Sequence, residues 1–471
     1  MPQRRSHVAP SAAQTELAAA LTALRESLET PTDFPAAVLA EAADAEAATP
    51  GLDLRDIPFV TLDPLGSRDL DQAFHLERRD AGYTVRYAIA DVPGFVAPGG
   101  AVDTEARRRG QTLYAADGTI PLHPKVLSED RASLLADVDR PALVWTFSLD
   151  SAGVAEEFRL ERALIRSRAQ LDYASTQVAL DRGEGGPAAL LPEIGALRIE
   201  QEKLRGGASL NLPDEEVVRH SDGTYEIERR HPLPVEEWNA QLSLMTGMAA
   251  ASLMIDAGVG ILRTMPQPDE KSFEAFRHQT EALGRPWTTG RYGEYLRRLD
   301  RADPMTLPVL EAAASLFRGA GYVTFDGAVP SEIEQAAIAA PYAHATAPLR
   351  RLVDRWSLAI CLAASEGREV PGWVRESLDD LPALMQESGQ RASKLDSATI
   401  NCVEAALLTP LVGATVDATV IEVRGERGTI QLADPAVTAS APIPADTVPG
   451  AVVPLQVVRA DIARGEIEFS V

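Results

Sequence analysis

The chain has 471 residues and a formal net charge of −24, and 45% of its residues are hydrophobic. This length predicts two or three domains with a large buried core. The two cysteines, Cys361 and Cys402, exclude a disulfide framework and a cysteine-ligated zinc site. The chain opens without the apolar stretch of a signal peptide, and its most apolar segment, 248–262, is interrupted by Asp256 and too short to cross a bilayer. We therefore expect a cytoplasmic protein without a membrane partner.

Two helices are predicted near the start of the chain. The first is indicated by leucines at helical spacing, namely Leu17, Leu21, Leu24 and Leu28. A proline-containing stretch at 31–35 ends this helix, and a second short helix is expected from about 36 to 47. Residues 1–50 contain seven acidic and three basic residues, so this module is acidic. The sequence leaves two arrangements open, a helix-turn-helix-like unit or plain packing against the rest of the protein.

The most informative segment places three carboxylates after a predicted buried strand. The apolar run 57–62 leads to Asp63, and Asp69 and Asp71 follow two residues apart, on the same face of an extended segment. Oxygen ligands without a nearby histidine or cysteine suit a hard cation such as Mg²⁺ rather than Zn²⁺. Like charges this close need a cation or a proton to neutralise them. A solvated acidic turn remains the alternative.

The central zone mixes strands and helices. A strand at 83–92 contains Asp91 near its end, and further strands are expected at 143–149 and 155–168. Arg107 to Arg109 form a basic cluster that is either a contact for an anionic ligand or a solvated helix face. After a glycine-rich loop at 183–186, helices are expected at about 236–257, 269–283, 308–318, 331–339, 348–364 and 381–408.

From residue 411 the pattern changes to short alternating strands, at 415–423, 428–432, 452–458 and 466–471. Short strands at this spacing are typical of a small OB barrel. Residues 411–471 contain four basic and eight acidic residues, and Phe469 is their one aromatic residue. Because OB folds bind single strands through basic grooves and aromatic stacking, we expect weak RNA binding or a purely structural role.

Several separated motifs occur in a characteristic order. They are Asp-x5-Asp-x-Asp at 63–71, Ile-Ala-Asp-Val at 89–92, Arg-Arg-Gly at 108–110, Ile-Pro-x-x-Pro at 120–124 and Thr-Ala-Pro-Leu-Arg-Arg at 346–351. This order resembles the catalytic RNB domain of the ribonuclease II and ribonuclease R family, from about residue 57 to 408. The resemblance implies an α+β protein with three parts. These are a helical module at 1–50 in place of paired cold-shock domains, a large mixed α/β RNB catalytic domain at 51–409, and an OB-fold barrel at 410–471.

The resemblance implies 3′-to-5′ hydrolysis of single-stranded RNA with a free 3′ end, releasing nucleoside 5′-monophosphates with Mg²⁺, or alternatively Mn²⁺, as cofactor. Asp63, Asp69 and Asp71 match the acidic cluster that binds the metal, and Asp71 matches the carboxylate on which cleavage depends most. Gln72 departs from the family, which has a fourth aspartate there. Its amide oxygen can still bind a cation, or its side chain points away from the cluster. Arg350 matches an arginine that contacts the phosphate near the scissile bond.

Five further positions are expected to bind RNA, namely Tyr114, Tyr173, Glu237, Arg351 and Asp396. Tyr114 matches a tyrosine that stacks on the 3′-terminal base, although a core aromatic role remains open for both tyrosines. Glu237 matches a glutamate that contacts the terminal nucleotide, and Glu236 beside it is the alternative. Asp396 is the nearest match to an acidic position late in the last long helix. His344 lies within the arginine motif, where we expect a packed or surface histidine.

The acidic charge bears on how RNA would bind. Non-specific RNA-binding proteins usually present a basic surface, so we expect RNA contacts to be confined to an interior path of a monomeric enzyme. Two other functions remain open. One is a Mg²⁺-dependent phosphohydrolase of another specificity, against which the motif order argues. The other is an RNA-binding relative without cleavage, suggested by Gln72, although the joint presence of Asp63, Asp69, Asp71 and Arg350 argues against it.

Overall fold

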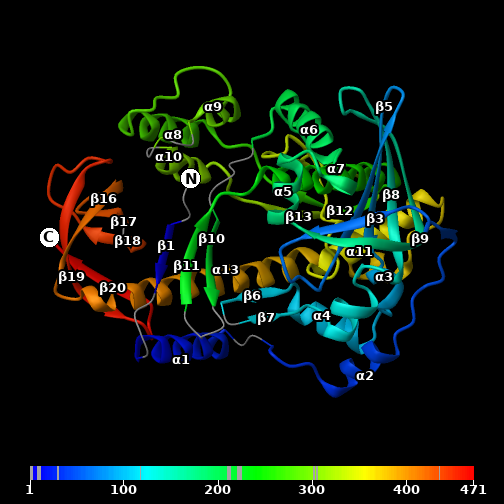
Figure 1. Cartoon of the computed structure of the whole chain (residues 1–471), viewed down its shortest axis with the longest axis horizontal. Helices are drawn as coiled ribbons and strands as arrows, with labels where there is room; N and C mark the ends of the chain where they lie inside the picture. The colour runs from blue at the N-terminus through cyan, green and yellow to red at the C-terminus, as the bar shows by residue number, and fades with distance from the viewer. Residues whose placement is uncertain are drawn as a thin grey trace.

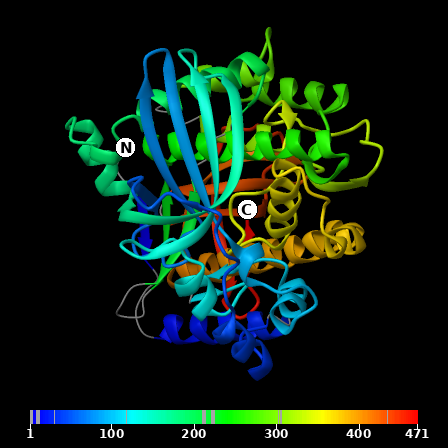
Figure 2. The same cartoon turned by 90° about the vertical axis from the view of Figure 1, so that its right-hand side faces the viewer.

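The structure is a computed structural model that describes residues 4–7, 12–28, 31–116, 118–208, 214–219, 225–300, 303, 306–433 and 435–471. Its centre is a six-stranded sheet with strand order β2-β9-β3-β4-β5-β8. Because β8 pairs with β9 as well as with β5, the longer strands close into a ring, seen from its side in Figure 2. The strands are β2 (Leu52–Asp53), β3 (Phe59–Asp63), β4 (Gln72–Arg79), β5 (Gly82–Ala90), β8 (Asp139–Asp150) and β9 (Ala155–Asp172).

The strand predicted at 57–62 is β3, which pairs with β9 in parallel and with β4 antiparallel. Its first four residues are buried, and Asp63 ends it. Asp71 directly precedes β4, and its carbonyl accepts a hydrogen bond from Ala90 N at 2.9 Å. The end of β3 and the start of β4 therefore hold the acidic residues at one rim of the ring.

Helices that follow the ring in the sequence supply the rest of the main core. The helix α11 is buried from Leu352 to Ala363, and its Trp356 belongs to the same cluster as Trp145 of β8. Figure 1 shows α7 and α11 beside the ring strands. The helices of this region are α5 (Tyr173–Asp181), α6 (Leu191–Arg205), α7 (Pro234–Ala257), α11 (Leu352–Ser365), α12 (Gly372–Ser377) and α13 (Leu381–Leu408).

Smaller elements connect these parts. Before α5 they are α3 (Val92–Phe95), α4 (Ala101–Arg109), β6 (Leu113–Ala115), β7 (Gly118–Ile120) and the π-helical turn at Leu127–Arg131. Between α5 and α11 they are a 3₁₀ turn at Gly186–Ala188, β12 (Val259–Thr264), α8 (Glu270–Ala282), α9 (Tyr292–Arg298), α10 (Thr306–Ala314), β13 (Gly321–Asp326), β14 (Glu334–Gln335) and β15 (Ala340–Pro341). Helices α8 to α10 pack around a small core of their own. The helix predicted at 331–339 is wrong, because this segment forms the β14–β15 hairpin.

The two predicted N-terminal helices are present as α1 (Ala12–Ser27) and α2 (Ala36–Asp44). They belong to different clusters. Helix α1 packs on α13, whereas α2 packs on α4. Of the two arrangements left open by the sequence, the structure shows packing against the rest of the protein. An unexpected strand, β1 (Arg4–His7), pairs with β11 (Tyr225–Arg230), which also pairs with β10 (Asp214–Arg219).

The C-terminal barrel has five strands in the order β18-β17-β16-β19-β20. They are β16 (Thr415–Arg424), β17 (Arg427–Ala433), β18 (Ala436–Pro442), β19 (Val452–Asp461) and β20 (Glu466–Ser470). Short 3₁₀ turns at Leu378–Asp380 and Thr409–Leu411 flank α13. The barrel shares one buried cluster with the C-terminal end of α13 and with Leu17 and Leu21 of α1. In the part of the chain that the structure describes, no helix combines the length and apolarity needed to cross a membrane.

Candidate active site

An ion pair between Asp71 and Arg350 joins the acidic rim to the segment before α11. The Asp71 carboxylate is 1% exposed. Its Oδ1 accepts from the backbone N–H of Leu349 at 2.8 Å, and its Oδ2 accepts from Nε of Arg350 at 2.9 Å. Burial raises the pKa of Asp71 to about 7, although the positive charge of Arg350 opposes this shift. The pKa of Arg350 lies above its ordinary value because Asp71 and Tyr114 outweigh the effect of burial.

Asp63 and Asp69 lie beside this pair. Burial raises the pKa of Asp63 to about 6, against the charge of Arg350 and with that of Asp69. The Oδ2 atom of Asp63 is buried and has no hydrogen-bond partner. The pKa of Asp69 is also raised, mainly by burial. A buried carboxylate oxygen without a donor, next to a second carboxylate, fits a hard cation.

The acidic rim does not form a complete metal centre in this conformation. Among the described residues, no three or more His, Cys, Asp or Glu side chains are arranged to hold a metal ion. Asp71 already has both oxygens engaged, by Leu349 and by Arg350. Asp63 and Asp69 are thus the residues whose oxygens best fit a cation here.

Gln72 also contacts the segment before α11. Its amide nitrogen donates a hydrogen bond to the carbonyl oxygen of Thr346. Gln72 is the first residue of β4 and pairs with Ile89 of β5, which fixes its backbone. Asp71 and Gln72 therefore both contact the segment before α11.

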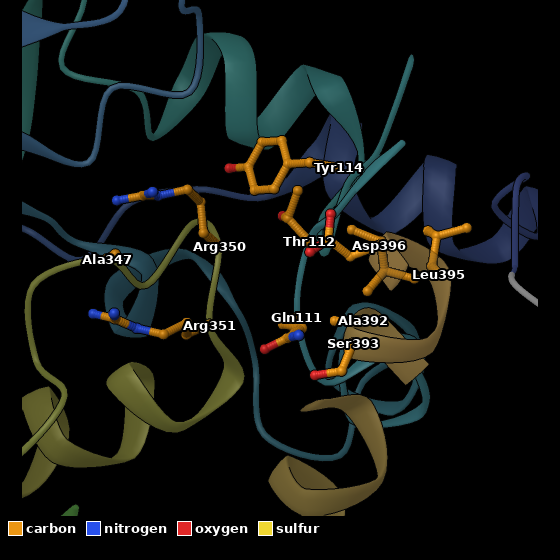
Figure 3. Close-up of a pocket in the computed structure, with 11 residues that line it drawn as sticks. Gln111, Thr112, Tyr114, Ala347, Arg350, Arg351, Ala392, Ser393, Leu395 and Asp396 are labelled. Carbon is orange, nitrogen blue, oxygen red and sulfur yellow. The ribbon is translucent and has the colours of Figure 1, made fainter. Parts of the chain in front are cut away.

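A cavity of about 370 Å³ opens next to Arg350. It brings together four of the predicted site residues, namely Tyr114, Arg350, Arg351 and Asp396. Figure 3 shows Tyr114 with its hydroxyl directed toward Arg350, and Asp396 on α13 at the other side. The Tyr114 side chain is largely exposed, at 58%. Burial of its hydroxyl end raises the pKa of Tyr114 to about 12, so the hydroxyl keeps its proton at neutral pH.

Arg351 has a more constrained position than Arg350. Its Nε and Nη2 atoms donate to the two carboxylate oxygens of Asp354, at 2.8 and 2.9 Å. This bidentate pair lies within the first turn of α11 and fixes the arginine against the helix start. Arg351 is therefore a fixed part of the cavity wall. The guanidinium of Arg350, which pairs with Asp71, is the one that contacts the acidic rim.

Other cavity residues were not predicted from the sequence. Gln111 and Thr112 line it from the segment after α4, and Ser393 lines it from α13. The Thr112 N–H donates to the carbonyl of Arg350 at 2.9 Å, and Gln111 pairs with Arg351 in an isolated β-bridge. Their place directly after the Arg-Arg-Gly motif was a usable signal for Gln111 and Thr112. We find none for Ser393.

Tyr173 and the start of α7 form a second group outside this cavity. Burial raises the pKa of Tyr173 to about 12, and the negative charge of Asp63 adds to the shift. The Tyr173 hydroxyl accepts from Asn239 at 3.5 Å. Glu236 caps α7 by accepting from Leu233 N at 2.9 Å and also pairs with Arg230 at 2.7 Å. Glu236 is thus engaged in capping and in an ion pair, and Glu237 is the next residue in the first turn of α7.

Asp91 and the arginines at 107–109, which belong to the sequence motifs, form hydrogen bonds and ion pairs within the protein. Asp91 is fully buried, caps α3 and pairs with Arg162 at 2.6 Å. In the basic cluster, Arg108 and Arg109 both pair with Glu105, at 2.7 and 2.8 Å. The third member, Arg107, pairs with Asp103 at 3.3 Å. All three arginines are therefore paired, but only Arg109 is buried, whereas the Arg108 side chain is 55% exposed.

His344 is a packed residue, which is one of the two outcomes expected. Its Nδ1 lies 2.7 Å from the hydroxyl of Tyr322, and its ring contacts Tyr322 and Tyr342 edge-on. Burial lowers the pKa of His344 to about 3, so its imidazole is neutral.

Comparison with known proteins agrees with the family resemblance seen in the sequence motifs. The RNB domain profile matches residues 52–360, and the profile of the RNase II-type exonuclease C-terminal S1 domain matches residues 414–471. Exosome complex exonuclease RRP44 homolog A of Arabidopsis thaliana is 30% identical over 366 residues, which are 73% of this chain and 37% of that protein. Ribonuclease R of Escherichia coli strain K12 is 28% identical over 388 residues, 77% of this chain and 47% of that protein. The chain thus spans less than half the length of these two curated relatives.

Solved structures show the same fold. Mycoplasma genitalium RNase R, in complex with ribose methylated single-stranded RNA, superposes with a TM-score of 0.87 at 16% identity, covering 97% of this chain and 78% of that one. Yeast Ssd1, described as a pseudonuclease, superposes with a TM-score of 0.69 at 16% identity, covering 88% of this chain and 52% of that one. Since the RNB profile covers more than half of the sequence, the chain belongs to the RNB-domain family of ribonuclease II and ribonuclease R.

Proposed function

We propose that this protein is a Mg²⁺-dependent exoribonuclease that degrades single-stranded RNA from a free 3′ end and releases nucleoside 5′-monophosphates. The observation that supports this most directly is the position of Arg350. Its guanidinium contacts Asp71 of the acidic rim, and it also lines the open cavity with Tyr114 and Asp396. One arginine thus connects a place for a cation with a place for a terminal nucleotide.

Each residue has a distinct task in this proposal. Asp63, Asp69 and Asp71 would hold the cation, which when bound supplies an activated water and neutralises phosphate oxygens. Mn²⁺ has similar ligand preferences and is the alternative cation. Arg350 would donate to the phosphate at the scissile bond, where its planar fork matches the phosphate oxygens.

The cavity would bind the nucleotide at the 3′ end. The exposed ring of Tyr114 offers a surface for base stacking. Asp396 on α13 can accept hydrogen bonds from ribose hydroxyls, as can Glu237 together with Tyr173 on the side of Asp63. Arg351, fixed by Asp354, would orient the backbone that enters the cavity.

The proposal extends to the whole chain. The three parts at 1–50, 51–409 and 410–471 would act as one monomeric enzyme, with the barrel adding little affinity because of its acidic composition. Both cysteines, Cys361 and Cys402, are buried and unpaired, which fits work in the reducing cytoplasm. Gel filtration with light scattering tests the monomer.

The deciding experiment uses single-stranded RNA labelled at its 5′ end, incubated with the full chain in Mg²⁺ or in EDTA and resolved on a sequencing gel. We expect a ladder that shortens from the 3′ end in Mg²⁺ and intact RNA in EDTA. Equal shortening in EDTA, or cuts in a circular RNA, would contradict the proposal.

A second candidate is an RNA-binding protein without cleavage. Two observations favour it, namely the engaged oxygens of Asp71 and the similarity of the fold to yeast Ssd1, described as a pseudonuclease. In that case the same gel shows intact RNA in both conditions, while the labelled RNA is still retained in a binding assay.

A further inference from the structure

The segment from Thr346 to Leu352 carries Arg350 and is extended or turn-like until α11 begins. Several groups hold its backbone. Asp354 of α11 accepts from the N–H of Ala347 at 2.7 Å, and the carbonyl of Gly110 accepts from the N–H of Leu352 at 3.0 Å. Gln72 donates to the carbonyl of Thr346, Asp71 accepts from the N–H of Leu349, and the N–H of Thr112 donates to the carbonyl of Arg350. The segment that carries Arg350 is therefore held from the start of β4 and from the segment after α4 as well as by the first turn of α11.

The contact with Gln72 depends on the amide. Thr346 is 3% exposed, so its carbonyl needs a donor from the protein. An amide side chain can donate to a carbonyl oxygen, whereas an ionised carboxylate can only accept. An aspartate at position 72 would be one methylene shorter and would bring negative charge toward Thr346. A glutamine at position 72 can thus donate the hydrogen bond that the Thr346 carbonyl needs, whereas an aspartate cannot.

We propose that Gln72 is a positioning residue that anchors the Arg350 segment to the start of β4, and that it is not a metal ligand. Its backbone is fixed by pairing with Ile89 in the ring, so the anchor is attached to a rigid element. Together with Asp71, it ties the acidic rim to the arginine. The catalytic part of this inference rests on the proposed exoribonuclease function, whereas the anchoring itself does not.

Anchoring and ligation predict different effects of substitutions at Gln72, and Gln72→Ala separates them. A glutamate has nearly the same shape, cannot donate to Thr346, and adds a carboxylate to the rim. If Gln72 were a ligand, Gln72→Glu would tighten Mg²⁺ binding and Gln72→Ala would weaken it. If Gln72 is an anchor, both substitutions loosen the segment, and Gln72→Ala leaves Mg²⁺ affinity close to native. Gln72→Ala also keeps the test usable if the added charge in Gln72→Glu prevents folding.

The first measurement is amide hydrogen exchange of the full, metal-free chain, followed in peptides that cover residues 345–352. We expect exchange there to be faster by roughly tenfold in both Gln72 variants. Gln201 provides a matched control, because its side-chain amide donates at 3.0 Å to the carbonyl of Ala152, on a distant hairpin. Gln201→Glu and Gln201→Ala should leave exchange at 345–352 unchanged.

The second measurement is Mg²⁺ binding by calorimetry without RNA, and the third is turnover of short RNA at saturating Mg²⁺. For Gln72→Ala we expect a dissociation constant for Mg²⁺ within about twofold of native, and a reduced kcat with little change in KM, because Arg350 acts on the reacting phosphate. Unchanged exchange at 345–352 in Gln72→Ala, or a large loss of Mg²⁺ affinity, would overturn the proposal. If the native chain degrades no RNA, the proposed function fails, and exchange and calorimetry still decide the role of Gln72.

Discussion

At the scale of single residues, the positive charge of Arg350 interacts with two neighbouring side chains. It pairs with buried Asp71 and lies beside the Tyr114 hydroxyl. A buried carboxylate is costly without a cation close to it, and Arg350 supplies that charge in the structure. The Arg350 side chain is 41% exposed, so an incoming phosphate can reach it.

Replacing Asp71 by asparagine tests this arrangement. The new side chain can still accept from Leu349 N, but it lacks the charge that pairs with Arg350 and attracts a cation. We expect single-turnover cleavage to fall by roughly 10² to 10⁴, with RNA affinity changed by less than about fivefold. Asp53→Asn is the matched control, since Asp53 forms an exposed pair with Arg55 at 2.6 Å, and it should cleave at the native rate. Native cleavage by Asp71→Asn would show that another carboxylate carries the reaction.

Tyr114 separates the role of an aromatic ring from that of a hydroxyl. Since base stacking on an aromatic side chain is worth about 1–3 kcal/mol, Tyr114→Ala should raise KM for short RNA by roughly 5- to 150-fold. Tyr114→Phe keeps the ring and should stay within about threefold of native. Steady-state kinetics on a short oligoribonucleotide measure both variants. An equal effect of the two substitutions would assign the role to the hydroxyl.

The sequence predicted the chemistry of individual site residues better than their partners. Asp63, Asp71 and Arg350 could be chosen because each lies in a recognisable motif. Two hydrogen bonds join segments that are more than 200 residues apart, one between Thr112 and Arg350 and one between Gln72 and Thr346. The local sequence pattern around these residues does not indicate either bond. The cluster at Arg107 to Arg109 resembled a basic surface, yet Arg109 is 2% exposed and forms an ion pair with Glu105.

At the scale of elements, helix predictions from local sequence were correct where apolar residues at helical spacing are buried on one face. They failed where a turn interrupts the segment. Helix α13 begins and ends within the predicted range 381–408. The segment 331–339 has good helix formers but folds as a hairpin. There Gln335 accepts with its side chain from the N–H of Ala337 at 2.7 Å, and Ala339 adopts a positive φ of 54°. Such a turn overrides a modest helix propensity.

Helix α1 and the barrel depend on each other. Leu21 is 3% exposed and shares a buried cluster with Val403 and Leu407 of α13 and with strands of the barrel. Removing residues 411–471 would therefore expose apolar surface of α1 and α13. Loss of RNA binding after such a truncation would reflect lost packing as well as any lost RNA contact, so substitutions on the barrel surface are the better test of RNA binding.

The shared cluster can be tested by Leu21→Ala. Because this change leaves a cavity between α1, α13 and the barrel, we expect the free energy of unfolding to fall by about 2–5 kcal/mol. Leu39→Ala on α2 is the matched control, since Leu39 is 47% exposed, and its effect should stay within about 0.5 kcal/mol. Urea unfolding followed by circular dichroism measures both. A loss below about 1 kcal/mol for Leu21→Ala would mean that α1 is only loosely attached.

At the scale of the whole molecule, stability should depend on pH through two buried histidines. Burial lowers the pKa of His123 to about 4 and that of His344 to about 3, whereas an unfolded histidine has a pKa near 6.5. Below about pH 6.5 the unfolded chain binds protons that the folded chain does not, until the pH reaches the folded values. Their contribution to stability is therefore complete above pH 6.5 and is lost as the pH falls.

We expect this part of the free energy of unfolding to decrease by about 1 kcal/mol for each histidine between pH 6.5 and 5.5. Asp63 and Asp71, whose pKa values are raised, make the opposite contribution over this range. The check is therefore the difference between native protein and His344→Gln in urea unfolding at both pH values, with the variant lacking one such histidine step. Identical pH dependence in native protein and His344→Gln would contradict the assignment.

The cluster that joins α1 to the barrel also has a consequence for how the chain is made. On the ribosome, Leu17 and Leu21 are synthesised more than 380 residues before their partners, which lie between Cys402 and Phe469. At about 5–20 residues per second, the nascent helix waits roughly 20 to 80 seconds with its apolar face uncovered. Chaperone binding to the growing chain would therefore concentrate on α1, and its release would coincide with completion of the barrel.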